Sequence, residues 1–206
     1  MQSASGRQSV EEWLAELGSA APAPGGGAAA AMSAAVAAGL VEMVANLTTG
    51  RARYAEYEAD TTRILARAGE LRTEAVRLIE RDAVAFRALM DAYRIDRNEP
   101  GRAAAVRTAT LAAAQPPLAI AVLAAEVADL AAELPGRSNR TVLSDVAVAA
   151  TTAAAAIESA AINVDINLSV LPAADRAPLA SRLAAATDRI GPARDLAARL
   201  RTEVAS

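Results

Sequence analysis

The side chains that could perform chemistry in this chain are almost all carboxylates. The 206 residues include no His and no Cys, and every one of the 21 basic residues is Arg. These absences exclude a thiol nucleophile, a Ser-His-Asp triad and a typical zinc site. They also exclude a Schiff-base lysine and the lysine of a P-loop. Proton transfer must therefore use Asp, Glu or Tyr, and the residues present require no metal and no redox cofactor.

The first candidate carboxylate, Asp82, lies on the apolar face of a predicted long helix, whereas its charged neighbours Glu80 and Arg81 lie off that face. A carboxylate that faces a core costs free energy unless it is paired or hydrogen-bonded. We therefore expect Asp82 either to face a substrate or to cap a helix or salt-bridge an Arg within the bundle. The apolar face repeats with a helical period through Ile64, Ala68, Leu71, Ala75, Leu78, Ile79, Phe86, Leu89, Met90 and Tyr93.

A second predicted helix, over residues 141–171, carries a line of small polar residues on an otherwise apolar surface. At 100° per residue the line falls within about an 80° arc. Such a line suits either a tight helix–helix contact or a polar pocket, and packing explains Thr152 and Ser159 better than the other members. The members are Asp145, Thr152, Ser159, Asn163 and Asn167.

A glycine-rich segment precedes a third candidate helix, which is rich in alanine and ends near Gly50. Gly25, Gly26 and Gly27 offer backbone that a ligand can approach closely, at the positive end of a helix dipole. The alternative is that this segment only makes a turn. Asn46 shares a face with Glu42 on the same helix. Arg51 follows the helix, where it binds a ligand or simply compensates the dipole of the helix end.

The elements that must position these residues are predicted to be helices. Hydrophobic residues make up 53% of the chain but aromatic residues only 2%, so Ala, Leu, Val and Ile must fill the core. We predict an all-α, single-domain bundle of long helices over residues 1–206, in which Ser9 and Glu12 form a capping box. Further helices are expected over residues 54–95, 102–114, 117–134 and 138–171, with one or two more in the tail, interrupted near Gly191.

Charge and hydropathy restrict the surroundings of the protein. A net charge of −3 argues against nucleic-acid binding, and residues 1–7 are not followed by the apolar run of a signal peptide. The most apolar stretch, residues 28–47, is mostly Ala and includes Glu42. A carboxylate in the middle of a membrane span costs about 2.5–3.5 kcal/mol on insertion scales. We therefore expect a cytoplasmic protein with no membrane span.

Taken in order, these segments are similar to the cyclodeaminase/cyclohydrolase family, which also forms the C-terminal half of formiminotransferase-cyclodeaminase. The similarity extends from about Val10 to Leu168, and residues 172–206 form C-terminal helices beyond it. The segments that carry it are Val10-Glu11-Glu12-Trp13-Leu14, Pro22-Ala23-Pro24-Gly25-Gly26-Gly27, Met43-Val44-Ala45-Asn46-Leu47-Thr48 with Gly50 and Tyr54, Asp82-Ala83-Val84-Ala85-Phe86, Ser144-Asp145, and Ala161-Ile162-Asn163-Val164-Asp165-Ile166-Asn167-Leu168.

The resemblance implies a homodimer whose helices line a folate pocket, with a tetrahydrofolate derivative as substrate and no tightly bound cofactor. It implies either hydrolysis of 5,10-methenyltetrahydrofolate to 10-formyltetrahydrofolate or cyclisation of 5-formiminotetrahydrofolate with loss of ammonia. We expect the hydrolase, because no formiminotransferase half is attached. The catalytic candidates are Asp82 and Asp145, and the substrate-binding candidates are Gly25, Gly26, Gly27, Asn46, Arg51, Asn139, Ser144, Asn163 and Asn167.

The expected roles are to bind a cation and to move a proton. Asp82 or Asp145 would orient or deprotonate water at the one-carbon bridge, and the other carboxylate, with Asn163 or Asn167, would read the pterin. The residues 25–27 or Arg51 would hold the glutamate tail. The chain departs from the family pattern at Thr141 and Ala147. An inactive folate binder and a helical dimerisation module therefore remain as alternatives.

Overall fold

The computed structural model describes residues 8–205, and within them every regular element is a helix. The predicted all-α class is therefore confirmed. Two short 3-10 segments, η1 (Ala52–Tyr57) and η2 (Arg140–Val142), lie in the connections. The α-helices are α1 (Val10–Leu17), α2 (Gly26–Asn46), α3 (Glu58–Arg94), α4 (Arg102–Glu133), α5 (Leu143–Ser169), α6 (Ala173–Thr187) and α7 (Ile190–Ala205).

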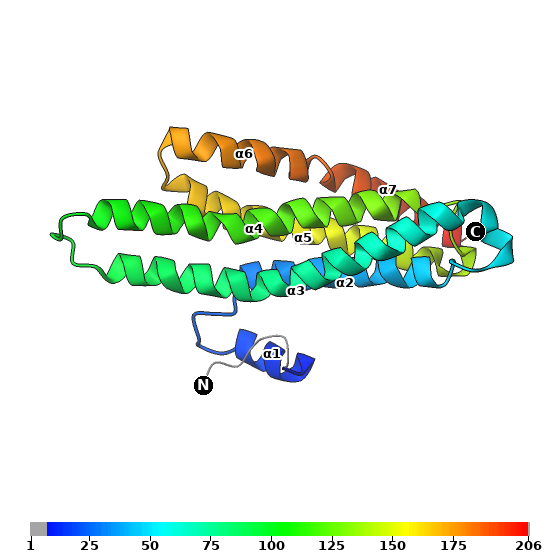
Figure 1. The fold of residues 1–206 in the computed structure, drawn as a ribbon, viewed down its shortest axis with the longest axis horizontal. Helices are drawn as coiled ribbons and strands as arrows, with labels where there is room; N and C mark the ends of the chain where they lie inside the picture. The colour runs from blue at the N-terminus through cyan, green and yellow to red at the C-terminus, as the bar shows by residue number, and fades with distance from the viewer. Residues whose placement is uncertain (1–7, 206) are drawn as a thin grey trace.

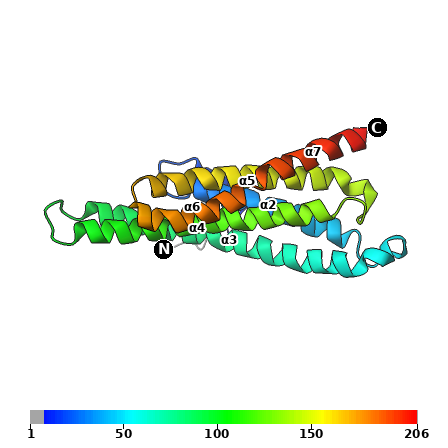
Figure 2. The same cartoon turned by 90° about the horizontal axis from the view of Figure 1, so that it is seen from above.

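Four long helices, α2 to α5, run side by side and form the body of the molecule (Figure 1). Successive members of this set run in opposite directions. Helices α6 and α7 cover the α4–α5 side, whereas α1 lies outside the body (Figures 1 and 2). The start of α2 and the end of α5 therefore lie toward one end of the bundle, and the end of α2 and the start of α5 lie at the other.

Alanine explains how α2 packs at the centre. Its buried residues cover a broad arc, a little more than half of the helix circumference, which is wider than the apolar stripe of a typical surface helix. A side chain of one carbon lets neighbouring helix axes approach closely, and α2 packs against α3, α4 and α5. The buried positions of α2 are Gly27, Ala28, Ala30, Ala31, Ala34, Ala35, Ala37, Ala38, Val41, Val44 and Ala45.

The helix ends follow the predicted signals in part. The capping box is confirmed, because the Glu12 backbone N–H donates to Ser9 Oγ at 3.2 Å and the Ser9 N–H donates to Glu12 Oε2 at 2.8 Å. The predicted helix over residues 54–95 is divided into η1 and α3. The break in the tail falls just before Ile190, so Pro192 lies in the first turn of α7, where a missing N–H costs little.

The prediction of two helices separated by Pro116 and Pro117 is wrong, because α4 continues through both prolines. A proline in a helix interior removes one backbone hydrogen bond and costs about 3 kcal/mol. Here both prolines are buried, and the helix packs on α3 and α5 along its length. Burial of the flanking Ala114 and Leu118 offsets the local cost, so tertiary packing overrides the sequence signal.

Three segments are long and apolar enough to cross a membrane when judged by length and composition alone: α2, α4 and residues 140–169. In the bundle, much of this apolar surface is buried between helices. The same helices carry charged side chains that pair with α3. Glu42 of α2 accepts from Arg72 at 2.6 Å, and Glu126 of α4 accepts from Arg67 at 2.6 Å. The absence of a membrane span stays a prediction.

Candidate active site

A cavity of about 530 Å³ opens where the start of α2 meets the second half of α3, the first half of α4 and the end of α5. It brings together six of the residues predicted from sequence: Gly25, Gly26, Gly27, Asp82, Asn163 and Asn167. Its other lining residues are Pro22, Ala23, Phe86, Leu89, Met90, Tyr93, Thr110, Ala113, Pro117, Ile166, Ser169 and Val170. Segments from four parts of the chain thus build one pocket.

Asp82 reaches this cavity because the face of α3 on which it lies turns from core to pocket along the helix. Upstream of Asp82 the face is buried at Ala75 and Leu78, and downstream Phe86 and Tyr93 line the cavity. Partial burial raises the pKa of the Asp82 carboxyl above its ordinary value, with no opposing hydrogen bond or charge among the described residues. The alternative of a salt bridge to an Arg is therefore not found within residues 8–205.

The glycine-rich start of α2 lies against two polar side chains. A Cβ added at Gly27 would lie 2.4–2.5 Å from the carboxyl atoms of Asp82. A Cβ at Gly26 would lie 3.5 Å from the amide of Asn163, an ordinary contact. The segment is thus more than a turn, since it brings backbone against Asp82 from α3 and Asn163 from α5.

The two asparagines of α5 present acceptors to the cavity. Asn163 Nδ2 donates to the Ser159 carbonyl at 2.8 Å, and Asn167 Nδ2 donates to the Asn163 carbonyl at 2.9 Å. These bonds fix each amide with one N–H engaged. Among the described residues no donor is bonded to either Oδ1, so both oxygens are available to a ligand.

The electrostatic character of the cavity is simple. Of its lining residues only Asp82 and Tyr93 can ionise, and no basic side chain is among them. The cavity therefore holds one carboxyl group within largely apolar walls. In surroundings of low polarity a cation is attracted to such a carboxylate more strongly than in water. The arrangement suits a flat, partly apolar cation whose polar edge can donate hydrogen bonds.

Phe86, Tyr93, Thr110 and Ile166 are cavity residues that the sequence interpretation did not assign to a site. The helical period places Phe86 and Tyr93 on the same apolar face of α3 as Asp82. The signal that could have found them is their spacing, because residues 82, 86 and 93 recur on one side of a helix. Thr110 is buried, and its Oγ1 donates to the Val106 carbonyl at 2.8 Å. A single Thr in an alanine-rich helix does not stand out in the sequence, so Thr110 could not have been predicted.

The other five predicted residues lie at the opposite end of the bundle. Along α5 the 18 residues from Asp145 to Asn163 correspond to about 27 Å, since a helix rises about 1.5 Å per residue. Within one chain, Asp145 therefore does not line the cavity that Asn163 lines. The helical arc correctly grouped these residues by direction but took no account of distance along the axis. The five are Asn46, Arg51, Asn139, Ser144 and Asp145.

Their contacts at that end are partly structural. The Asn139 side chain accepts from the Thr141 N–H at 3.1 Å and donates to the Leu47 carbonyl at 3.4 Å, so it caps η2 and ties it to the end of α2. Asn46 and Arg51 are exposed. None of these contacts assigns them to a substrate, and their binding roles stay predictions.

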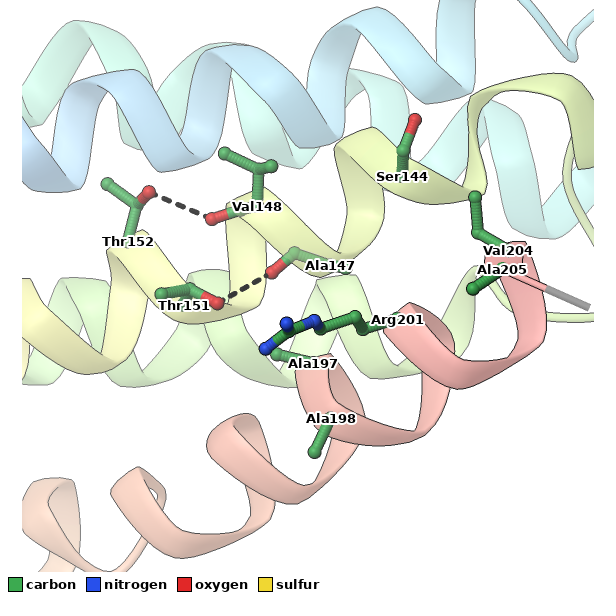
Figure 3. Close-up of a pocket in the computed structure, with 10 residues that line it drawn as sticks. All are labelled: Ser144, Ala147, Val148, Thr151, Thr152, Ala197, Ala198, Arg201, Val204 and Ala205. Carbon is green, nitrogen blue, oxygen red and sulfur yellow. Dashed lines mark hydrogen bonds between the residues drawn. The ribbon is translucent and has the colours of Figure 1, made fainter.

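A second cavity, of about 590 Å³, lies between the first half of α5 and α7 (Figure 3). Ser144 and Thr152 line it, and the Arg201 side chain reaches from α7 into the space between the two helices. The Thr152 hydroxyl is occupied, because it donates to the Val148 carbonyl at 2.8 Å. No carboxylate lines this cavity, so the groups needed for proton transfer are in the first one.

Within residues 8–205, no cluster of three or more acidic side chains could hold a metal ion.

The chain is similar to known proteins over most of its length. The family model described as formiminotransferase-cyclodeaminase matches residues 9–185. A methenyltetrahydrofolate cyclohydrolase of Methylorubrum extorquens is 41% identical over 182 residues, which cover 86% of each chain. The formimidoyltransferase-cyclodeaminase of Mus musculus is 31% identical over 164 residues, which are 78% of this chain but 30% of the mouse protein.

The fold has a close match among solved structures. The crystal structure of a formiminotetrahydrofolate cyclodeaminase from Thermotoga maritima aligns with a TM-score of 0.90, at 25% identity, over 98% of this chain and 99% of that one. The helical arrangement that builds the cavity is thus a known one. On the family match and the identity to these relatives, the chain belongs to the formiminotransferase-cyclodeaminase family.

Proposed function

We propose that this chain is a methenyltetrahydrofolate cyclohydrolase, which hydrolyses 5,10-methenyltetrahydrofolate to 10-formyltetrahydrofolate. The observation that carries the proposal is a cavity in which the partly buried Asp82 is the sole carboxylate and no basic residue is present. The methenyl bridge is part of an amidinium cation, so its charge is complementary to that cavity. The 41% identical relative, matched over most of both chains, bears the name of this activity.

In the proposed reaction, Asp82 acts as the general base and then as the general acid. It takes a proton from a water molecule as the water oxygen bonds to the bridge carbon. The tetrahedral intermediate then breaks its bond to N5, which receives the proton held by Asp82. The remaining hydroxyl proton leaves to solvent as the formyl C=O forms on N10. Burial raises the pKa of Asp82, which makes its carboxylate a stronger base than an exposed one.

The remaining cavity residues are proposed to orient the pterin. The free Oδ1 atoms of Asn163 and Asn167 can accept hydrogen bonds from the amino-pyrimidine edge, and Phe86 and Tyr93 supply flat apolar walls. The glutamate tail is anionic and has no basic partner in the cavity, so we place it outside the mouth. Arg51 and Asp145 can contribute to this cavity only if a second copy of the chain brings them there.

The proposal includes a cytoplasmic homodimer that binds folate, needs no metal or tightly bound cofactor, and binds neither nucleic acid nor membrane. The homodimer rests on the resemblance described above, and the location rests on the charge and hydropathy of the sequence. The folate substrate is supported by the names of the relatives, which include cyclohydrolase and cyclodeaminase.

Formiminotetrahydrofolate cyclodeaminase is the second candidate. It is favoured by the TM-score of 0.90 to a protein of that name, since the same helices would enclose either substrate. In that reaction Asp82 would donate a proton to the departing ammonia. Higher identity to the cyclohydrolase than to the mouse protein makes this the second choice.

The test is the loss of 5,10-methenyltetrahydrofolate absorbance, measured against its spontaneous hydrolysis. The wild type is expected to accelerate the loss, and Asp82→Asn to lower turnover by roughly 10²–10⁴-fold, the usual contribution of a general base. Asp165→Asn is the matched control, because Asp165 is an exposed carboxylate on α5 that does not line the cavity. Full activity in folded Asp82→Asn would remove Asp82 from the reaction. No wild-type acceleration would exclude the cyclohydrolase, and 5-formiminotetrahydrofolate would then test the cyclodeaminase.

A further inference from the structure

Gly27 lies in the first turn of α2 with the carboxyl group of Asp82 directly against it. A Cβ on Gly27 would be 2.4 Å from Asp82 Oδ1 and 2.5 Å from both Cγ and Oδ2. Separations below 3.0 Å are far inside van der Waals contact, so the carboxyl group occupies the volume that any side chain at position 27 would need. The two residues come from different helices, Gly27 from α2 and Asp82 from α3.

The neighbouring glycines do not have this restriction. A Cβ at Gly26 would meet Asn163 at 3.5 Å, an ordinary contact, and one at Gly25 would meet nothing within 4 Å. Backbone conformation does not explain the glycine at position 27 either, because the glycines with positive φ are Gly50, Gly101 and Gly136. Inside a helix, glycine is usually less favourable than alanine. What glycine provides at position 27 is space for one carboxyl group.

The place that Gly27 leaves open also has a favourable electrostatic character. The helix begins at Gly26, and its N-cap residue, Gly25, makes no side-chain capping bond. The positive end of the α2 dipole is therefore not covered by a capping side chain, and a carboxylate next to the first turn is stabilised by it. Asp82 approaches this turn from α3, and the cavity lies on its other side.

We propose that Gly27 is a positioning residue, which sets where the Asp82 carboxylate stands between the first turn of α2 and the substrate cavity. For catalysis this rests on the proposed function, in which Asp82 moves the proton. A methyl group at position 27 pushes the carboxyl group away from α2 and into the cavity. The Asp82 oxygen that takes the proton is then no longer in the right place to activate the water that attacks the bridge carbon.

The experiment compares Gly27→Ala with its matched control Gly39→Ala, which makes the same chemical change on the same helix but outside the cavity, where a Cβ would meet only Arg72 at 3.6 Å, an ordinary contact. The first readout is the titration of the Asp82 carboxyl by ¹³C NMR, assigned with Asp82→Asn, and it requires no activity. The second is turnover of 5,10-methenyltetrahydrofolate. Gly27→Ala is expected to change the Asp82 titration from that of the wild type, because the displaced carboxyl group leaves the first turn of α2 and meets a different degree of hydration. It is also expected to lower turnover roughly 100-fold, as misplacement by about 1 Å can do.

Gly39→Ala is expected to leave both readouts as in the wild type. An unchanged Asp82 titration in Gly27→Ala would overturn the positioning role, whatever happens to turnover. Equal effects of the two substitutions would overturn it as well. If the titration moves only in Gly27→Ala while even the wild type fails to hydrolyse the substrate, the positioning is supported and the cyclohydrolase function is lost.

A third variant covers the case in which Gly27→Ala does not fold. Asp82→Ala removes the carboxyl group that the new methyl would meet, so Gly27→Ala/Asp82→Ala is expected to fold with the melting temperature of Asp82→Ala or higher. Restored folding would support the contact as the reason for glycine at position 27. A double variant as unstable as Gly27→Ala would show that another contact is responsible, and the inference would be wrong.

Discussion

Asp82 and Asp175 show how the surroundings of a carboxyl group in this bundle set its acidity. The Asp175 carboxylate accepts two bonds from Arg107, at 2.5 and 2.7 Å, and this guanidinium lowers its pKa. Asp82 has no such partner among the described residues, and partial burial raises its pKa. A carboxylate paired with Arg, as Asp175 is, occurs readily at a protein surface. A partly buried carboxyl group without a partner, as Asp82 is, costs stability and therefore points to a function.

The stability of the protein is expected to depend on pH through Asp82. Because its folded pKa is raised, the folded state favours the protonated form, so this contribution to stability is lost as pH rises from about 3.8 through the folded pKa. Asp82→Asn mimics the protonated form and should raise the melting temperature at neutral pH. Below pH 3.8 the difference should vanish.

The melting temperatures are measured by circular dichroism, and Asp175→Asn is the control. Its folded pKa is lowered, so its contribution to stability is present above about 3.8 and is lost as pH falls through the folded pKa. Asp175→Asn should therefore change the melting temperature in the opposite direction at neutral pH. A melting temperature of Asp82→Asn equal to that of the wild type throughout would show that burial of this carboxyl has no energetic cost.

At this scale the sequence predicted the cavity residues well wherever a polar group interrupted an apolar face. Asp82, Asn163 and Asn167 were found in this way, and the glycines before α2 were found by their position at a helix start. Asp145 was grouped with them because it points in the same direction on α5. Direction around a helix is readable from spacing, but which neighbouring helix reaches a given level along the axis depends on the tertiary fold.

At the scale of elements, α2 depends on side chains that are small. Ala34 is fully buried, and its replacement by Leu adds three carbons where the neighbouring helices leave no space. Such overpacking costs about 1–3 kcal/mol, so Ala34→Leu is expected to lower the melting temperature by roughly 2–12 °C. Val36→Leu on the same helix is the control, since Val36 is 50% exposed. Equal melting temperatures for the two variants would show that α2 is loosely packed.

Helix α4 shows that tertiary packing can override a local sequence signal. The pair Pro116 and Pro117 predicts a break, yet the helix passes through it because both rings are buried against the bundle. The capping box at Ser9 and Glu12 shows the opposite case, in which every partner lies within one turn. Signals completed within one turn were therefore predicted well, and signals that compete with long-range contacts were not.

For the whole molecule, the open question in the sequence is whether its apolar helices face other helices, lipid or a second chain. Within the bundle, ion pairs join α3 to α4 through Arg67 and Glu126, and α3 to α2 through Arg72 and Glu42. Paired charges on the outer surface of α3 favour water over lipid. One exposed apolar stripe remains at the end of α5, where Ile162, Ile166 and the C-cap residue Val170 are each more than 60% exposed in the single chain. Such a stripe favours burial against a partner.

These features predict a water-soluble dimer. Without detergent, the protein is expected to remain in the supernatant after ultracentrifugation and to show by light scattering a mass of twice 21.0 kDa. The apolar surface of α2 and α4 is already used between helices, and a dimer would cover part of what is left on α5. Recovery only with detergent would contradict the bundle as the native form. A mass of 21.0 kDa would contradict the dimer and would leave Arg51 and Asp145 without a route to the Asp82 cavity.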